Sequence, residues 1–264
     1  MKTPLSRSER APQRDALARL VDDLESRHLG QLTFPEIRRA LQALSQIYVQ
    51  KRERLGAGAV FDGAGKRAAF ALYYGPLHFA LTEAVLKELE PIPGRTDALI
   101  DLGCGTGVVG AAWALHCNAS RVTGFDVSRW ASDEARRCYR VLGLRGRVVT
   151  RAIRTGGEPL RADAIVAGYF VNELQPRVRD AVLESLLTAA QGGTRVLVIE
   201  PIARSFVRWW ELWTSEFLAR GGRADEWRVG WDRPEIIARL DHAAKLDHRE
   251  LRARTLYLGS EVIR

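Results

Sequence analysis

The sequence contains few cysteines and no long apolar run. Only Cys104, Cys117 and Cys138 occur among its 264 residues, and their spacing matches neither a metal site nor a disulfide framework. No apolar stretch approaches the roughly 20 residues that a membrane-spanning helix needs. The first residues, MKTPLSRSERAPQR, lack the apolar core of a signal peptide. We therefore expect a cytoplasmic protein with reduced thiols, no membrane segment and no bound metal.

Lysine is also scarce, although the chain is basic. Of the 40 basic residues 35 are Arg, and the net charge of +8 divides into +3 for residues 1–100, +3 for 101–200 and +2 for 201–264. This even spread predicts no basic tail and no single dense patch of the kind that binds a phosphate backbone. Arginine suits phosphate binding, but a compositional bias of the genome gives the same count. The charge alone therefore leaves a nucleic-acid partner open.

The chain begins with segments of helical periodicity. Apolar residues recur at helical spacing between about 13 and 54, and Thr33 with Glu36 has the spacing of an N-cap followed by an acid at the third helical position. The glycine-rich stretch 56–65 predicts a break. Pro76 is expected to open another helix, PLHFALTEAVLKEL. We expect residues 1–66 to form an N-terminal helical extension.

After residue 97, apolar strand-like runs alternate with helical stretches. Such alternation is typical of an α/β fold with a doubly wound, mostly parallel sheet and helices on both of its faces. The predicted strands are 98–102, 121–126, 147–153, 162–170 and 194–200.

A glycine-rich loop lies between the first predicted strand and its helix. LIDLGCGTGVVG (99–110) places Gly103, Gly105 and Gly107 after a strand that ends in Asp101. Glycines allow a tight turn and a close approach of the backbone to a ligand, and the following helix N-terminus favours a carboxylate or phosphate. Because ligands of open α/β sheets bind at the carboxyl ends of strands, this loop is the expected ligand site.

Two cofactors are compatible with the loop at first sight. GTGVVG (105–110) matches the dinucleotide fingerprint G-x-G-x-x-G, and Asp126 lies about 20 residues further on, where an acid binds ribose hydroxyls. The wider pattern is D-x-G-x-G-x-G with Asp101 at the strand end, a position that is usually apolar in dinucleotide folds. This pattern resembles the motif of class I S-adenosylmethionine-dependent methyltransferases, and we prefer that interpretation to NAD binding.

The resemblance implies a Rossmann-like fold with seven strands and a role for each loop residue. Asp101 would organise the loop near the methionine end of S-adenosylmethionine, and Gly103, Cys104, Gly105 and Gly107 would pass beneath the cofactor. Asp126 would bind the ribose, with Val127 near the adenine. In the alternative interpretation the glycines only turn the chain, Asp126 caps the helix that begins near Arg129, and Cys104 is only a small loop residue.

The fourth predicted strand ends in VAGYFVNEL (166–174). In class I methyltransferases this segment faces the reactive methyl group. Together with VLVIEP (196–201) and PLHFALTEAVLKEL, it resembles the methyltransferase-like family of the mitochondrial and bacterial small ribosomal subunit, over roughly residues 67–201. Mitochondrial-type members carry cysteines for an iron–sulfur cluster, partly after this core. No cysteine follows Cys138 here, so a cluster is not implied.

The polar residues of this segment are the candidates for chemistry. Tyr169 and Asn172 are expected to line the cofactor or substrate site. Glu173 or Glu200 is a candidate to accept a proton or to position a donor, and Asn172 is a candidate to hydrogen-bond the substrate or the cofactor amine. In the alternative interpretation, Asn172 and Glu173 cap the helix that begins near Pro176.

A tryptophan-rich segment, residues 205–231, follows the core. Five of the seven tryptophans lie here, interleaved with arginines. They are candidates to stack single-stranded bases, to cover an apolar small molecule, or to pack against the sheet. Beyond it, PEIIARLDHAA reads as a helix and LRARTLYLG as a final strand in an antiparallel hairpin at the sheet edge.

The sequence thus predicts a methyltransferase domain over residues 67–264. Its expected function is methylation of ribosomal RNA or a role in small-subunit assembly, with S-adenosylmethionine as cofactor. A small-molecule methyltransferase and a non-catalytic assembly factor that binds the cofactor are the alternatives. Neither the methyl acceptor nor the oligomeric state follows from the sequence.

Overall fold

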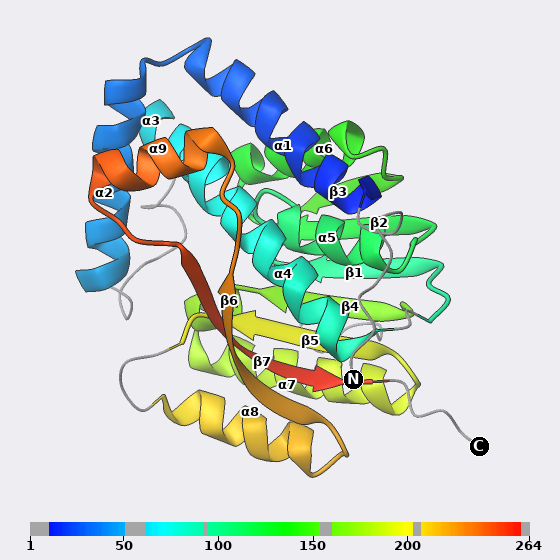
Figure 1. The fold of residues 1–264 in the computed structure, drawn as a ribbon. Helices are drawn as coiled ribbons and strands as arrows, with labels where there is room; N and C mark the ends of the chain where they lie inside the picture. The colour runs from blue at the N-terminus through cyan, green and yellow to red at the C-terminus, as the bar shows by residue number, and fades with distance from the viewer. Residues whose placement is uncertain (1–10, 51–61, 92–93, 154–159, 203–206, 260–264) are drawn as a thin grey trace, which may run out of the picture.

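The computed structural model describes residues 11–50, 62–91, 94–153, 160–202 and 207–259 (Figure 1). Its helices are α1 (Ala11–Leu29), α2 (Phe34–Gln50), α3 (Ala64–Ala69), the π-helix η1 (Phe70–Tyr74), α4 (Gly75–Leu89), α5 (Val108–His116), α6 (Arg129–Val141), the 3₁₀-helix η2 (Val171–Glu173), α7 (Pro176–Gln191), α8 (Arg208–Leu218) and α9 (Glu235–Ala244). No helix within these ranges combines the length and the apolar character needed to cross a membrane.

The strands form one seven-stranded sheet in the order β3-β2-β1-β4-β5-β7-β6. They are β1 (Ala98–Leu102), β2 (Arg121–Asp126), β3 (Gly146–Thr150), β4 (Ala164–Gly168), β5 (Arg195–Glu200), β6 (Arg223–Gly230) and β7 (Glu250–Leu258). The pairs from β3 to β5 are parallel, whereas β7 pairs antiparallel with both β5 and β6. The predicted fold class and the predicted terminal hairpin are both confirmed: this is the class I methyltransferase fold with helices preceding it.

Both faces of the central strands are buried, which explains their nearly continuous apolar sequence. In β5, Leu197 and Ile199 join the core beneath α4, α5 and α6, while Val196 and Val198 join a second core beneath α7 and α8. Figure 1 shows α7 and α8 on one side of the sheet and α4, α5 and the N-terminal helices on the other. The carboxyl ends of β1, β2, β4 and β5 meet at one edge of this parallel core.

The N-terminal helices share the first of these cores. Residues of α1 and α2 are buried together with α4 and α5, and the predicted pair at the start of α2 is present: the Glu36 carboxylate accepts hydrogen bonds from the Thr33 amide at 2.8 Å and from the Thr33 hydroxyl at 2.7 Å. The predicted boundary between an N-terminal helical extension (1–66) and a methyltransferase domain (67–264) stays a prediction, because the N-terminal helices pack into the same core as that domain.

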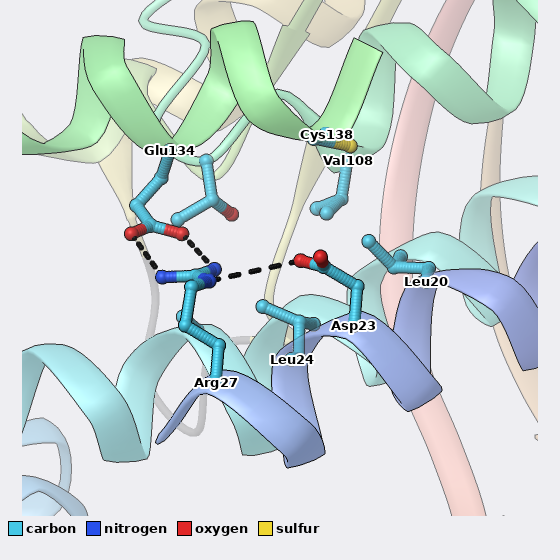
Figure 2. Close-up of a pocket in the computed structure, with 9 residues that line it drawn as sticks. Leu20, Asp23, Leu24, Arg27, Val108, Glu134 and Cys138 are labelled. Atoms are coloured by element: carbon cyan, nitrogen blue, oxygen red, sulfur yellow. Dashed lines mark hydrogen bonds and ion pairs between the residues drawn. The ribbon is translucent and has the colours of Figure 1, made fainter. Parts of the chain in front are cut away.

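Two bidentate ion pairs join α1 to α6. The Arg27 guanidinium donates to both carboxylate oxygens of Glu134 at 2.6 and 2.7 Å (Figure 2). The Arg137 guanidinium donates to the Asp23 carboxylate at 2.6 to 3.1 Å. Planar paired hydrogen bonds of this kind fix orientation as well as distance. The small cavity beside them, about 10 Å³, is also lined by Thr106 of the glycine loop, so α1 packs against the back of that loop.

The helix predicted to open at Pro76 is confirmed: α4 begins at Gly75, with Pro76 in its first turn. A π-turn, in which the Gly75 amide donates to the Phe70 carbonyl, joins α4 to α3. Two predicted strand boundaries were wrong. Strands β3 and β4 end at Thr150 and Gly168, earlier than predicted. The predicted break at 56–65 lies mostly outside the described residues.

Candidate functional site

The β1–α5 loop adopts the left-handed backbone that its glycines permit. Gly103, Gly105 and Gly107 have φ angles of +65°, +52° and +79°. A Cβ at Gly107 would lie 2.9 Å from the Cβ of Ala135, whereas a Cβ at Gly105 would meet no atom within 4 Å. The loop is thus packed against α6 at Gly107 and open at Gly105, where a ligand can approach the backbone.

Asp101 ties the end of β1 to the first turn of α5. Its side chain is buried, and Oδ2 accepts a hydrogen bond from the Gly110 amide at 3.0 Å. Burial raises the pKa of this carboxyl to about 8, and the charge of Asp126 adds to the rise, while the bond from Gly110 opposes it. Asp101 therefore holds a proton more readily than a free carboxyl group and shapes the loop from inside the fold.

Asp126 holds the loop from the neighbouring strand. One carboxylate oxygen accepts from the Gly105 amide at 2.9 Å, and the other accepts from the Ser128 amide at 2.7 Å. The N-cap of α6 is Ser128, whose hydroxyl accepts from the Ala131 amide, so the alternative that Asp126 caps this helix is wrong. Val127 lies beside it with 59% of its surface exposed.

Cys104 faces the interior. Its amide donates to the Phe125 carbonyl at 2.9 Å, and a Cβ at Gly124 would lie 2.7 Å from its sulfur. Burial raises the pKa of the thiol well above its usual value. The sulfur is thus held protonated against β2, and it is the backbone of Cys104 that contributes to the loop.

The segment after β4 begins with a strained tyrosine. Tyr169 has a φ of +56°, which is unfavourable for an aromatic residue. Its amide donates to the Ile199 carbonyl at 2.7 Å, and its ring stacks on His78 with 3.7 Å between centroids. Burial raises the pKa of Tyr169 and lowers that of His78 to about 3. Both rings are therefore neutral and pack together beside the loop.

Phe170, the next residue, brings this segment onto the glycine loop. A Cβ at Gly103 would lie 2.0 Å from Cδ2 of the Phe170 ring. The ring therefore rests directly on the backbone of Gly103. The sequence analysis missed this contact because a glycine and an aromatic residue 67 positions apart give no local signal of their pairing.

Glu200 organises the rest of the segment from the end of β5. Its side chain is buried, with a residue exposure of 1%. Oε1 accepts from the amides of Val171 at 2.8 Å and Asn172 at 3.2 Å, and Oε2 accepts from Nδ2 of Asn172 at 2.6 Å. Burial raises the pKa of Glu200 to about 7. With three donors on its two oxygens, the carboxylate holds η2 in place.

Asn172 connects this arrangement to α8. Its Oδ1 accepts a hydrogen bond from Nε1 of Trp209 at 3.2 Å, while its Nδ2 donates to Glu200. Arg179 donates to the carbonyls of Val171 and Leu174, and its guanidinium lies 5.0 Å from the centroid of the Trp209 ring. The N-cap of α7 is Gln175, so Asn172 and Glu173 do not cap the helix at Pro176.

Glu173 is the acidic side chain of this segment that solvent reaches. It is exposed, yet the surrounding protein raises the pKa of its carboxyl to about 7, with a further contribution from the charge of Asp126. No hydrogen bond within the described residues occupies this carboxylate. The negative charge of Asp126 thus acts on Glu173, and both lie at the carboxyl edge of the sheet.

The tryptophans of the 205–231 segment mostly pack inside the fold. Trp210 and Trp213 are buried against the sheet, and the indole N–H groups of Trp227 and Trp231 donate to Thr255 and to the His248 carbonyl. The packing interpretation is thus correct for these four rings. The segment also forms β6, which its sequence did not reveal; residues 205 and 206 lie outside the described ranges.

The predicted site residues divide into two groups that the fold brings to the same edge of the sheet. The first group, Asp101, the glycine loop and Asp126, lies at the ends of β1 and β2. The second group follows β4, with Tyr169 and the η2 residues Asn172 and Glu173, and includes Glu200 at the end of β5. The contact between Phe170 and Gly103 joins the two groups.

The comparisons with known proteins agree with this arrangement. Residues 80–195, less than half of the chain, match the family model described as the Methyltransferase small domain. A Ribosomal protein L11 methyltransferase of Shewanella woodyi is 26% identical over 144 residues, which are 53% of this chain and 48% of that protein. A Ribosomal RNA small subunit methyltransferase C of Pseudomonas aeruginosa is 39% identical over 83 residues, 31% of this chain and 24% of that protein.

The chain spans less than half the length of these two relatives. Among solved structures, N-methyltransferase NodS from Bradyrhizobium japonicum aligns with a TM-score of 0.48 and 13% identity, over 84% of this chain and 99% of that one. The family match and the sheet order together define a class I methyltransferase domain, for which S-adenosylmethionine is the methyl donor.

The residues present fit this donor. Gly105 offers an open backbone of positive φ next to Asp126. Each oxygen of the Asp126 carboxylate accepts one amide hydrogen bond in the structure, and carboxylate oxygens have capacity for more. A half-buried acid with remaining acceptor capacity at the end of β2 suits the two hydroxyls of a ribose.

Proposed function

We propose that the protein methylates ribosomal RNA of the small subunit. The observation that supports the proposal is the Glu200-held segment, which carries the exposed Glu173 at the carboxyl edge of the sheet, where Asp126 ends β2. The partial match to a small-subunit ribosomal RNA methyltransferase supports the choice of acceptor.

Each group at this edge of the sheet has its own role in the proposed reaction. S-adenosylmethionine supplies, when bound, a methyl group on a positively charged sulfur that leaves as a neutral thioether. The glycine loop and Asp126 hold the donor, and Asn172, fixed between Glu200 and Trp209, orients the acceptor. Holding the acceptor in line with the methyl carbon removes most of the entropic barrier. Glu173 receives the proton that the acceptor atom loses on methylation.

Replacing Glu173 by glutamine tests the proton-accepting role. The wild-type rate is expected to rise with pH up to about 7, because the carboxylate accepts a proton only when it is ionised and its pKa is raised to about 7. Glu173→Gln should lower kcat by roughly 10²- to 10⁴-fold, the usual contribution of a general base. Glu184→Gln, an exposed acid on α7, is the control. If the rate of Glu173→Gln rose with pH in the same way as the wild-type rate, the proton-accepting role of Glu173 would be excluded.

A ribosomal protein is the second candidate acceptor. It is favoured by the similarity to a ribosomal protein L11 methyltransferase, which extends over 53% of this chain. The two acceptors need the same donor site, so the experiment must separate them by product.

The test is to incubate the protein with methyl-labelled S-adenosylmethionine and separated pools of small-subunit ribosomal RNA, ribosomal proteins and metabolites. Label is expected in the RNA and should disappear with Asp126→Ala, which loses the proposed ribose contact. Label in the protein pool alone selects the second candidate, and label in the metabolite pool alone indicates a small-molecule methyltransferase. No label in any pool, with cofactor binding intact, indicates a non-catalytic assembly factor.

A further inference from the structure

Five arginines surround an open hollow at the outer edge of the sheet. The hollow has a volume of about 550 Å³ and lies where β2 and the edge strand β3 begin and α6 ends. Its arginines are Arg121, Arg136, Arg140, Arg145 and Arg147. We call these residues the arginine hollow. Its floor includes Gly146 and the buried side chain of Tyr139. Because Gly146 has no side chain, the Tyr139 ring can lie against its backbone.

Most of this positive charge has no acidic partner. Among the described residues, Arg121, Arg140, Arg145 and Arg147 make no ion pair, and all four are exposed. Arg136 pairs with Asp133 at 2.7 Å and donates to the Val148 carbonyl at 2.9 Å. Like charges gathered without counter-charges repel one another, so the cluster is stabilised when an anion binds.

The arginine hollow corrects the expectation of an evenly spread charge. The net charge of residues 101–200 is only +3, because the acidic residues of this part of the chain offset most of its arginines. The fold separates them: Asp101 and Asp126 lie at the carboxyl ends of β1 and β2, whereas Arg121 and Arg147 lie where their strands begin. A dense basic patch therefore exists, although the linear sequence does not show it.

The chemistry of the arginine hollow suits a phosphate backbone better than a protein surface. Protein interfaces bind through an apolar, aromatic centre, yet the large hydrophobic residues exposed in this structure, Val127, Leu212 and Leu218, do not line the hollow. Guanidinium groups form paired hydrogen bonds with phosphate oxygens. An open hollow rimmed by several of them can follow successive phosphates of one strand.

Its position relative to the donor site suits a single RNA ligand. Helix α6 runs from Arg129, next to Asp126, to the hollow, and its 13 residues span roughly 20 Å. Each strand of a DNA duplex rises about 3.4 Å per nucleotide, and at a comparable spacing about six or more nucleotides of RNA cover that distance. One RNA can therefore touch the arginine hollow while its acceptor lies at the donor site.

We propose that the arginine hollow binds the phosphodiester backbone of the RNA substrate at a distance from the methylated nucleotide. This inference rests on the proposed function for the identity of the RNA, and it deepens that function by assigning a docking surface. Contacts to phosphates position the RNA without reading its sequence, so the hollow contributes affinity and orientation rather than choice of base.

The test compares two triple variants of the full chain. The first is Arg140→Gln, Arg145→Gln and Arg147→Gln in the arginine hollow. The control is Arg228→Gln, Arg249→Gln and Arg252→Gln, three exposed arginines on or beside β6 and β7, toward the opposite edge of the sheet. Both variants lose the same charge. Two control residues pair with surface acids, Asp247 and Glu250, and such pairs contribute little stability.

Affinity for a labelled fragment of small-subunit ribosomal RNA is measured over a range of salt concentrations. We expect the hollow variant to bind about tenfold or more weakly, and its plot of log affinity against log salt to be shallower by about 2, since each lost phosphate contact removes about 0.7 to 0.9 from the slope. The control variant should bind like the wild type. Binding of S-adenosylmethionine, measured by calorimetry, should be unchanged in both and confirms that they fold.

The outcomes separate this inference from the proposed function. Equal affinity of all three proteins for RNA overturns the hollow as a docking surface, even where methyl transfer to RNA is observed. Loss of RNA binding in the hollow variant supports it, even where RNA is not the methyl acceptor. Loss of binding to a purified acidic ribosomal protein, with RNA binding unchanged, overturns it and assigns the surface to a protein partner.

Discussion

Replacing Glu200 by alanine is expected to disorder the segment after β4 and to abolish methyl transfer. The carboxylate accepts hydrogen bonds from the amides of Val171 and Asn172 and from the Asn172 side chain. Removing it leaves donors without acceptors in a buried place, and each costs about 1–3 kcal/mol. We therefore expect the free energy of unfolding to fall by about 2–5 kcal/mol, measured by urea denaturation.

Glutamine at the same position distinguishes positioning from proton transfer. In Glu200→Gln the amide oxygen still accepts from the Val171 and Asn172 amides, while the new amino group faces Nδ2 of Asn172. Asn172 then has to turn its own amide, which removes the acceptor of the Trp209 indole. A positioning residue predicts a loss of activity within about tenfold for this variant, whereas loss of a general base costs 10²–10⁴. A loss in the higher range would restore Glu200 as a candidate base.

The pH dependence of stability gives a second readout for the same residue. Because burial raises the pKa of Glu200 to about 7 in the folded protein, the folded state binds this proton more tightly than the unfolded chain does. The stability that the folded protein gains from binding this proton is therefore complete below the pKa of the unfolded chain, near pH 4.5, and is lost as the pH rises toward 7. The stability of the wild type relative to Glu200→Gln should decline across this interval and level off above it.

The parts of this fold that the sequence predicts are those with local causes. Apolar runs such as ALIDL and VLVIE are long enough to be buried on both faces, and they became β1 and β5. The glycine loop was recognisable because Gly103, Gly105 and Gly107 occupy positions of positive φ. In these cases the residue type is restricted by its own backbone or its own burial.

The parts that escaped prediction depend on residues distant in the chain. Strand β6 alternates half-buried and exposed residues at the sheet edge, and its charged sequence RADEWRVG is held by pairing with β7. Glu200 was identified as a polar residue after a strand, but its three donors lie 28 or 29 positions away. The arginine hollow likewise arises only when α6, β2 and β3 meet.

One tertiary contact adds a second structural requirement to the glycine motif. The glycine pattern predicts a loop that passes beneath a ligand, and nothing in the motif says what covers it. Phe170 provides part of that cover, since its ring rests on Gly103. Gly103 therefore has two requirements, a left-handed backbone and an absent side chain, and they can be separated by experiment.

Gly103→Ala is expected to destabilise the protein strongly and to weaken cofactor binding. The new Cβ would lie 2.0 Å from Cδ2, 2.3 Å from Cγ and 2.8 Å from Cβ of Phe170. The φ of +65° adds about 1–2 kcal/mol for a residue with a Cβ, and forcing the ring aside adds about 1–3 kcal/mol. The expected loss is thus about 2–5 kcal/mol in urea denaturation, with S-adenosylmethionine affinity measured by calorimetry.

Two further variants separate the steric part from the backbone part. Gly143→Ala, at a φ of +72° with no atom within 4 Å of its Cβ, should show only the cost of about 1–2 kcal/mol for the backbone. Phe170→Ala in the Gly103→Ala background removes the clash, so the double variant should lose less stability than the sum of the two single variants. Simple additivity would mean that the ring does not rest on the loop. A coupling between the two positions would establish that the segment after β4 closes directly on the donor loop, so that the position of Glu173 depends on the same contact.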